Sequence, residues 1–468
     1  MNWPLLITYS QWLILLYFVS MNLAYLTLNL LSLRHIRRYI SEGALDALPY
    51  PYSGLEPTVS ILVPAYNEQA TIAGSLRSML QLSYPSYEIV VVNDGSKDET
   101  LAVLKREFAL IPYAEDYESS IPTRPVRGIY RSTRHPNLRV IDKENGGKAD
   151  SLNAGINAAH HTLFCGVDAD TVLQRDSLQR IVQPFLEDRR VIASGGTVRI
   201  ANGCEVSGGF LTRIGLPRNP LALFQVVEYL RAFLFGRLGW SSIGGLLIIS
   251  GAFGVFKRDV VLEVGGYSTD TVGEDMELVV RLHRLMRKWR RAYRIVFLPD
   301  PVCWTEAPED LRTLRNQRIR WQRGLAESMS RNFGLMFSRN GGVPGWVSFP
   351  FMMLFEWLGP LLEVFGYLLM ILFFVFDLIS WQMFAVFMFV TFSFGVLLSV
   401  SGLLLEEISF SLYKKPQHLL WLMLAVVVEN LGYRQLNSIW RLRGLTRWLF
   451  GSKHKWGDMK RKASWQQS

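Results

Sequence analysis

Cysteine is scarce in this sequence, and no segment of it repeats. The chain has three cysteines among 468 residues, and none of them forms a Cys-x-x-Cys pair. An odd number of widely spaced cysteines argues against a disulfide framework and against a zinc site, and it fits a reducing compartment. We expect these thiols to serve in packing.

Charged residues are also few: they make up 19% of the chain, against 49% hydrophobic residues. This balance excludes a disordered chain and is more apolar than is usual for a soluble enzyme. The net charge of +10 is compatible with nucleic acid, anionic lipid or an anionic substrate as a partner. The basic residues adjoin the apolar segments, at 34–38 and 441–462, which favours a lipid surface and no nucleic acid.

Long apolar runs lie near both ends of the chain. Residues 5–33 contain no charge and are followed by a basic flank, so we expect a transmembrane helix whose C-terminal end is cytoplasmic. Residues 346–376 and 383–405 are long enough to span, whereas 418–428 is short, which favours an interfacial or re-entrant helix. We therefore expect three to four spans in a multi-pass protein of the plasma (inner) membrane.

These patterns divide the chain into four parts. They are an N-terminal transmembrane helix with its basic flank (1–38), a cytoplasmic catalytic domain (56–335), C-terminal transmembrane and interfacial helices (345–440) and a basic tail (441–468). Three carboxylates, Glu356, Glu363 and Asp377, lie within or beside the apolar segment 346–376. Carboxylates in apolar segments usually face a bundle interior or a cavity, so Glu363 is interpreted either as a channel-lining residue or as half of a structural polar pair.

The middle of the chain alternates short apolar runs with amphipathic ones. Strands are predicted at 59–64, 87–92, 137–141 and 162–167, and helices at 69–82, 97–108 and 147–159. This alternation predicts a parallel sheet covered on both faces. The polar stretch 112–136 is interpreted as a long surface loop, with a regulatory or partner-binding insertion as the alternative.

Polar clusters follow the predicted strands at their carboxyl ends, where such sheets bind ligands. Asp168 and Asp170 come directly after an apolar run, and two carboxylates on one turn can reach a hard divalent ion that is shared with phosphates. Turn capping is the alternative. Asp94 can accept two N–H bonds from a planar base; alternatively, Ser96 and Glu99 form a helix capping box beside it.

Three further segments carry chemistry. Gly146-Gly147-Lys148 precedes a helix and suits a phosphate, with a solvated lysine as the alternative. Glu274 and Asp275 at a helix start satisfy the helix dipole or supply a general base. On a helix, Gln317 lies within one turn of Arg320 and Trp321, which suits a diphosphate and a sugar face; a basic amphipathic helix on the membrane is the alternative.

Taken in order, these segments resemble the membrane-bound family 2 glycosyltransferases, the processive group of cellulose, chitin, hyaluronan and poly-N-acetylglucosamine synthases. The matching segments are VSILVPAYNE, VVNDGS, NGGKADSLN, DAD, SGAFG, GED and QRIRW, with a basic WGDMKR near the C-terminus. The resemblance implies an α/β GT-A (Rossmann-like) domain with α-helical transmembrane segments. GGKAD is more similar to the N-acetylglucosamine polymerases than to cellulose synthases.

The resemblance also implies roles for particular residues. Asp275, with Glu274 beside it, is the catalytic base that takes a proton from the acceptor hydroxyl. Donor binding falls to Ala65, Tyr66, Glu68, Asp94, Lys148 and Asp168, with Asp94 on the uracil nucleoside and Lys148 near the diphosphate. Asp170 and Asp168 hold Mg²⁺ or Mn²⁺, and Gln317, Arg320 and Trp321 line the acceptor and diphosphate site.

The function that follows is an inverting, metal-dependent polymerisation of a β-linked exopolysaccharide from a UDP-sugar, with UDP-N-acetylglucosamine as the expected donor. The expected partners are the UDP-sugar, the growing glycan, the lipid bilayer and an accessory export subunit, with export of the polymer by the same chain left open. Transfer of a single sugar, for example to a lipid, and polymerisation from UDP-glucose are alternatives within the class. A catalytically retired membrane transport or scaffold protein is the alternative from another class.

Overall fold

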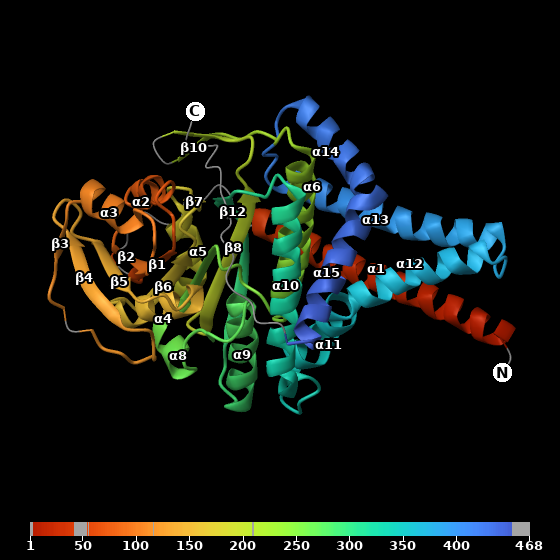
Figure 1. The fold of residues 1–468 in the computed structure, drawn as a ribbon, viewed down its shortest axis with the longest axis horizontal. Coiled ribbons are helices and arrows are strands. Elements are labelled where there is room, and N and C mark those ends of the chain that lie inside the picture. Colours follow the sequence, from red (N-terminus) through yellow and green to blue (C-terminus); the bar gives the residue numbers. More distant parts are fainter. Residues whose placement is uncertain (1–2, 42–53, 55, 116, 208–209, 452–468) are drawn as a thin grey trace.

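The computed structural model describes residues 3–41, 54, 56–115, 117–207 and 210–451. Figure 1 shows an α/β part at one end of the molecule and long helices that extend from it at the other. All three cysteines, Cys165, Cys204 and Cys303, are buried and unpaired, which agrees with their expected role in packing. The basic residues beyond 451, with the WGDMKR segment, lie outside the described residues.

A ten-stranded mixed sheet forms the centre of the α/β part. Its strand order is β3-β4-β5-β2-β1-β6-β11-β8-β12-β7, and β9 pairs with β10 in a separate hairpin. The strands are β1 (Val59–Ala65), β2 (Tyr87–Asp94), β3 (Leu110–Pro112), β4 (Val126–Ser132), β5 (Leu138–Lys143), β6 (Leu163–Val167), β7 (Val172–Leu173), β8 (Val191–Ile200), β9 (Glu205–Ser207), β10 (Phe210–Arg213), β11 (Phe253–Lys257) and β12 (Arg294–Thr305).

The four strands predicted from the sequence form the parallel core β5-β2-β1-β6. The expectation of a wholly parallel sheet is wrong, because β11 runs antiparallel between β6 and β8 and β4 runs antiparallel to β5. The loop expected at 112–136 is likewise wrong in part, since residues 126–132 form β4. Strand β4 is half-exposed and lies next to the outermost strand, β3. Near the edge of a sheet one face can meet water, so a strand there does not need the continuous apolar run of a core strand.

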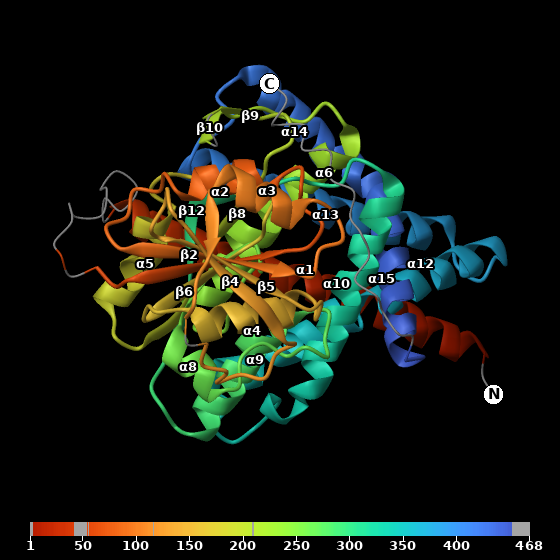
Figure 2. The ribbon, with the colours of Figure 1, turned by 60° about the vertical axis from the view of Figure 1, so that its left-hand side comes forward.

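Helices cover both faces of this sheet. They are α2 (Ile72–Met79), α3 (Thr100–Glu107), α4 (Lys148–Ala158), α5 (Ser177–Glu187) and α8 (Arg258–Glu263). Figure 2 shows α2 and α3 on one face and α4 on the other. Gly155 of α4 allows close packing, because a Cβ there would meet the Leu62 side chain of β1 at 3.2 Å.

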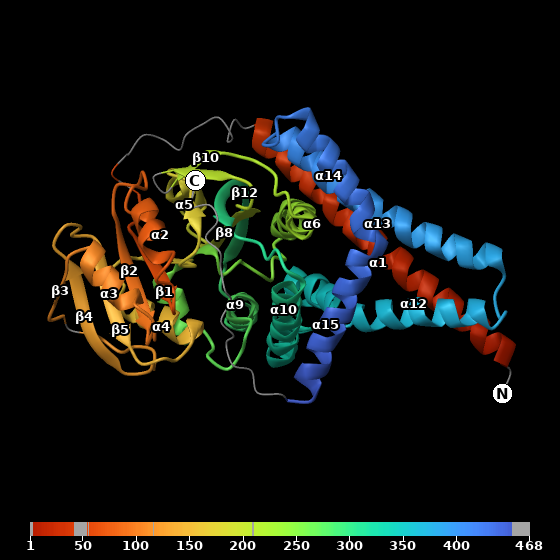
Figure 3. The same ribbon diagram turned by 45° about the horizontal axis from the view of Figure 1, so that its top comes forward.

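Two helices are long and apolar enough to cross a membrane, by length and composition: residues 7–41 of α1 (Trp3–Ser41) and the whole of α13 (Trp381–Ser409). The bent pair 344–357 and 359–375, with 44° between its halves, makes a third if it counts as one span. The pair comprises η3 (Pro344–Ser348), α11 (Phe349–Phe351), η4 (Met352–Trp357) and α12 (Gly359–Val375). Figure 3 shows α1, α12 and α13 extending away from the sheet. The expected minimum of three membrane spans is thus reached only if the bent pair counts as one span.

The remaining helices join the sheet to these long helices. They are α6 (Pro220–Tyr229), the π-helix η1 (Leu230–Arg237), α7 (Leu238–Ser242), α9 (Glu274–Lys288), α10 (Leu311–Arg331), η2 (Phe333–Leu335), α14 (Pro416–Val428), η5 (Glu429–Tyr433) and α15 (Arg434–Leu449). At 13 residues, α14 is too short to span, as its sequence suggested. Helix α15 continues through residue 440, where the sequence placed the start of a tail, and packs along α10.

A buried ion pair fixes the end of α13 to the sheet. Arg199 of β8 and Glu406 of α13 pair with one another, and their side chains are 2% and 1% exposed. A buried pair contributes little net stability, because both ions lose their hydration, but loss of one partner leaves an uncompensated charge. The pair therefore defines how α13 sits on the sheet.

Replacement of Glu406 by leucine should lower the free energy of unfolding by about 3–5 kcal/mol, because Arg199 keeps its buried charge. Apparent unfolding temperatures of the detergent-purified protein measure the effect. The double variant Arg199→Met/Glu406→Leu should regain most of the loss, and Glu205→Gln at the exposed Arg213–Glu205 pair should change little. A double variant as unstable as the single one would contradict this account.

Candidate active site

The carboxyl ends of β1, β2 and β6 meet at one edge of the sheet, as the sequence predicts. Tyr66, Asn67 and Glu68 follow β1, Asp94 ends β2, and Asp168 follows β6. The strands are neighbours and parallel, so these side chains come together. Asn67 adopts a left-handed conformation (φ 56°). Its backbone amide donates to Ser96 Oγ at 3.0 Å, which joins the ends of the two strands.

The capping box expected at Ser96 and Glu99 is absent. Helix α3 begins at Thr100 with no side-chain cap from Glu99. Asp98 Oδ1 instead accepts from the Thr100 amide at 3.0 Å. Ser96 is thus engaged by Asn67 across the strand ends, which takes it out of the helix start.

Asp94 is buried beneath the glycine-rich turn that leads into α4. Its Oδ1 accepts from Lys143 Nζ at 2.6 Å and from the Gly146 amide at 2.9 Å. Its Oδ2 accepts from the Gly147 amide at 2.7 Å and from Asn145 Nδ2 at 3.0 Å. Four donors satisfy both carboxylate oxygens, so Asp94 orders the turn; its contact with a nucleoside stays a prediction.

Lys148, the first residue of α4, connects the sheet edge to α9. Its Nζ lies 2.5 Å from Asp168 Oδ1 and 3.6 Å from Glu274 Oε1, and it donates to the Gly251 carbonyl at 3.4 Å. Burial lowers the pKa of Lys148, but the charges of Asp168 and Glu274 outweigh burial and raise the pKa above its ordinary value. The side chain is 14% exposed, so the alternative of a solvated lysine is wrong.

The two acidic residues of the GED motif begin helix α9, with Gly273 at the N-cap. Asp275 Oδ2 accepts from the Gly251 amide at 3.1 Å, and its Oδ1 accepts from the Met276 amide at 2.8 Å. Burial, and then the charge of Asp275, raise the pKa of Glu274, while Lys148 opposes them. The two backbone amides thus fix the Asp275 carboxylate at the start of α9; its role as a general base stays a prediction.

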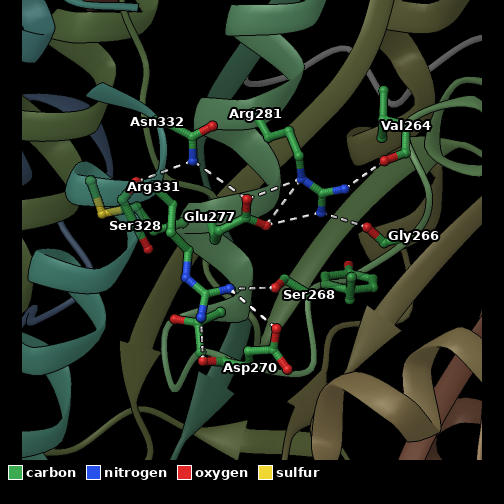
Figure 4. Close-up of polar contacts among 12 residues, drawn as sticks. Val264, Gly266, Ser268, Asp270, Glu277, Arg281, Ser328, Arg331 and Asn332 are labelled. Atoms are coloured by element: carbon green, nitrogen blue, oxygen red, sulfur yellow. Dashed lines mark hydrogen bonds and ion pairs between the residues drawn. The ribbon is translucent and has the colours of Figure 1, made fainter. Parts of the chain in front are cut away.

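The loop before α9 is held by arginines from two helices. Arg281 of α9 donates to the carbonyls of Val264 and Gly266, each at 2.6 Å, and Arg331 of α10 donates to the Asp270 carbonyl at 2.6 Å. Figure 4 shows these guanidinium groups on the loop backbone, with Glu277 and Asn332 between them. Carbonyl groups that a loop would expose to water are thus satisfied within the protein.

Helix α10 touches the same loop directly, with no side chain between the two backbones. A Cβ at Gly273 would lie 2.8 Å from the Gly324 Cα. Glu327 Oε2 accepts from the Val272 amide and from Thr271 Oγ1, each at 2.9 Å. The motif that carries Glu274 and the helix that carries QRIRW are therefore one rigid unit, which the sequence motifs alone did not indicate.

The QRIRW residues lie on α10 as predicted. Trp321 is 42% exposed, and the Arg318 guanidinium lies 4.4 Å from the centre of its ring. Arg318 itself pairs with Glu228 of α6 at 2.7 Å. An exposed indole that is held by a cation on one side offers its surface to a flat apolar partner such as a sugar ring.

One cavity of about 680 Å³ connects these groups. Nine of the predicted site residues line it: Tyr66, Glu68, Lys148, Asp168, Glu274, Asp275, Gln317, Arg320 and Trp321. Ala65, Asp94 and Asp170 are buried behind its wall. The cavity continues to Met21 and Tyr25 of α1, Glu363 of α12 and Asn437 of α15, so it extends from the sheet edge to the long apolar helices.

Glu363 forms a polar pair and also lines the cavity, while a channel there stays a prediction. Glu363 lines the cavity, and its Oε2 accepts from Ser438 Oγ at 2.5 Å. Glu356 also lines the cavity and pairs with Arg441 of α15 at 2.7 Å.

Addition of a methyl group at Gly324 should push α10 away from the loop at Gly273. Alanine normally favours a helix by about 1 kcal/mol over glycine, but overpacking costs about 1–3 kcal/mol, so Gly324→Ala should lower the apparent unfolding temperature. Gly334→Ala is the matched control, because a Cβ at Gly334 meets nothing within 4 Å. An equal or higher unfolding temperature for Gly324→Ala would contradict direct backbone packing.

His283 gives the fold a dependence on pH. Its ring nitrogens contact Tyr293 Oη at 2.6 Å and the Leu246 carbonyl at 2.7 Å, and burial lowers its pKa to about 4. In the unfolded chain His283 takes up a proton near pH 6.5, whereas in the folded protein it does so only near pH 4. The free energy of unfolding therefore keeps its full value above pH 6.5 and falls as the pH drops towards 4. The loss amounts to about 3 kcal/mol. Unfolding temperatures measured from pH 7 to 4 should fall less steeply for His283→Gln; parallel curves would refute this.

Comparison with known proteins places the chain in a family. The model described as Glycosyl transferase family 2 matches residues 60–206, and the model described as Glycosyl transferase family group 2 matches residues 164–398, half of the chain. The poly-beta-1,6-N-acetyl-D-glucosamine synthase of Staphylococcus aureus (strain COL) is 31% identical over 278 residues, which cover 59% of this chain and 56% of that protein. The corresponding synthase of Staphylococcus epidermidis is 29% identical over 276 residues, with the same coverage.

This chain thus matches just over half the length of these curated relatives. Among solved structures, a mannosyltransferase from Pyrobaculum calidifontis, in complex with GDP-Man and Mn²⁺, is similar with a TM-score of 0.54 and 19% identity. The match covers 90% of this chain and 99% of that one, so the two share the fold, and the predicted GT-A class is confirmed. The chain belongs to the family 2 glycosyltransferases.

Proposed function

We propose that this protein is a membrane glycosyltransferase that polymerises a β-linked polysaccharide from UDP-N-acetylglucosamine. One observation carries the proposal: nine of the twelve donor, base, metal and acceptor residues expected from the motifs line a single cavity, which continues to the apolar helices. The names of the staphylococcal relatives support N-acetylglucosamine as the sugar and a polymer as the product.

The orientation of α1 supports a cytoplasmic catalytic domain. The last turns of α1 expose Arg34, Arg37 and Arg38, and basic residues beside a span favour the cytoplasmic side. Tyr39 donates to Asp300 Oδ2 of β12 at 2.6 Å, so this end of α1 also contacts the sheet. Placement in the plasma (inner) membrane as a multi-pass protein follows in this proposal.

The residues of the cavity suggest how transfer proceeds. Asp275 takes the proton of the acceptor hydroxyl, the freed oxygen attacks the anomeric carbon of the donor, and the bond from that carbon to the UDP oxygen breaks with inversion. Lys148 and Arg320 balance the negative charge on the departing UDP. Glu274 holds Lys148 at 3.6 Å, which keeps the ammonium beside the reacting groups.

The DxD turn is proposed to hold Mg²⁺ or Mn²⁺ through Asp168 and Asp170. Hard oxygen donors suit both ions, so the chemistry of the two carboxylates fits. No group of three or more His, Cys, Asp or Glu residues that could hold a metal occurs within the described part of the chain. The donor diphosphate would therefore complete the ligand set, and the bound ion would neutralise charge on the leaving group.

Trp321 and the membrane-side walls suggest the path of the product. The exposed indole of Trp321 offers a sugar platform, and the cavity beyond it is lined from α1, α12, α13 and α15. A growing glycan would enter between these helices, which makes export by the same chain part of the proposal. An accessory export subunit is compatible with it, and no nucleic acid is involved.

The alternatives differ in what they require of this cavity. Transfer of one sugar to a lipid, or use of UDP-glucose, leaves the same carboxylates in place and changes the acceptor or the donor pocket. A retired transport or scaffold protein has no need for Asp275 to be fixed by the Gly251 amide or for Lys148 to lie between two carboxylates. These contacts favour an enzyme.

UDP release by the detergent-purified protein, with Mg²⁺ or Mn²⁺ and a panel of UDP-sugars, tests the proposal. We expect release with UDP-N-acetylglucosamine and a decrease of about 10²–10⁴-fold in Asp275→Asn, the range for loss of a general base. Asp259→Asn is the matched control, since Asp259 is exposed on α8. The product should grow to a polymer; release without a polymer would show single transfer, and no release with any UDP-sugar would contradict the proposal.

A further inference from the structure

Arginines are frequent on the membrane side of the cavity, and most are paired. Arg231 pairs with Glu429 at 2.5 Å, Arg318 with Glu228 at 2.7 Å and Arg441 with Glu356 at 2.7 Å. Each of these guanidinium groups forms an ion pair with a carboxylate of another element, although the Arg318 Nε is left without a hydrogen-bond partner among the described residues. Their charges therefore serve to join the helices of the cavity wall.

Arg237, the last residue of the π-helix η1, is different. It lines the cavity, but within the described part of the chain no carboxylate lies at ion-pair distance from it. Its Nη1 is buried and has no hydrogen-bond partner among those residues. A buried donor without a partner is costly, and such a group in a cavity indicates a ligand that satisfies it.

The guanidinium of Arg237 is also fixed in place. It lies 3.8 Å from the centre of the Phe233 ring, one turn earlier in η1. The Ser32 hydroxyl of α1 donates to the Phe235 carbonyl at 2.7 Å, and a Cβ at Gly239 would meet the Leu28 carbonyl of α1 at 2.7 Å. Since α1 holds η1 and α7 this closely, Arg237 has little freedom to turn towards bulk water.

Asp275 is the carboxylate whose charge acts on Arg237. Burial lowers the pKa of Arg237 to about 10, and the charge of Asp275 partly opposes this effect. Both residues line the same cavity, but Arg237 approaches from the helices packed on α1 and α13, whereas Lys148 comes from the sheet. The space beside Asp275 on the membrane side is where an acceptor must place its hydroxyl.

We propose that Arg237 binds the terminal sugar of the acceptor glycan, by donating hydrogen bonds to its hydroxyl or acetamido oxygens, and so positions that sugar against Asp275. This inference rests on the proposed function. A guanidinium can only donate, and a sugar offers oxygen acceptors on a ring that also suits the neighbouring aromatic side chains Phe233 and Trp240. Arg237 is then a determinant of acceptor affinity, separate from the donor site.

The test compares Arg237→Met and Arg237→Lys with the wild-type protein in detergent. UDP release is measured at saturating UDP-N-acetylglucosamine against the concentration of a soluble β-1,6-linked N-acetylglucosamine oligosaccharide. Loss of hydrogen bonds from a charged donor should raise the KM for the oligosaccharide by about 10- to 100-fold in Arg237→Met. Arg237→Lys should give a KM for the oligosaccharide between those of the wild-type protein and Arg237→Met. In both variants the KM for UDP-N-acetylglucosamine should stay within about twofold of the wild-type value. Arg106→Met, at an exposed arginine of α3, is the matched control.

Binding of the oligosaccharide, followed by tryptophan fluorescence without donor, gives a second readout that needs no turnover. It should weaken by the same factor as the KM, while binding of UDP should not change. If the Arg237→Met penalty persists with a de-N-acetylated oligosaccharide, the contact is to a hydroxyl; if it disappears, the contact is to the acetamido oxygen.

Three results separate the possible failures. An unchanged oligosaccharide KM and affinity in a folded Arg237→Met or Arg237→Lys protein would overturn the role of Arg237 and leave the proposed function intact. Weaker UDP binding would overturn it as well, because Arg237 would then belong to the diphosphate site. Absence of UDP release by the wild-type protein would instead refute the proposed function on which this inference rests.

Discussion

The direct contact between α10 and the loop before α9 is the constraint on which the rest of the site depends. Gly273 and Gly324 allow the two backbones to touch, because a Cβ on either residue would lie only 2.8 Å from the Cα of the other. The helix that carries Gln317, Arg320 and Trp321 thus lies against the loop that leads into Glu274 and Asp275. On its other side α10 is equally close to α15, since a Cβ at Gly444 would meet the Ile319 carbonyl at 2.7 Å. Helix α10 therefore transmits the position of the C-terminal helices to Asp275.

Electrostatics complete what backbone packing begins. Lys148 draws Asp168 and Glu274 towards one another from the sheet and from α9. Without that ammonium, the ends of β6 and α9 would present like charges across the cavity. In the proposed function, a donor diphosphate would add further negative charge there, and an accompanying cation would offset it. The contacts that hold these residues together would then also define where the nucleotide sugar binds.

The sequence predicted the parallel centre of the sheet because its strands are continuous apolar runs, as in β1 and β6. It missed β4, whose half-exposed residues resemble a loop, and it predicted no strand where β8, β11 and β12 complete the sheet, so the antiparallel direction of β11 was not anticipated. Motif residues near strand ends and on one helix turn could be predicted to meet, since both follow from local geometry. The contacts of Glu327 and Arg237 could not be predicted in this way. Glu327 accepts from the backbone of a loop that is distant in the chain, and Arg237 lines a cavity formed by several elements.

Ion pairs between elements explain why the membrane side of the cavity is so polar. Arg231–Glu429, Arg318–Glu228 and Arg441–Glu356 each join two elements that are far apart in the chain. Buried pairs add little net stability, but a shifted helix would separate the charges and leave both unpaired. They therefore select one arrangement of helices around the cavity. Arg237, which lines the same cavity as Asp275, has no such partner within the described part of the chain, so its charge joins no two elements and is available to what enters the cavity.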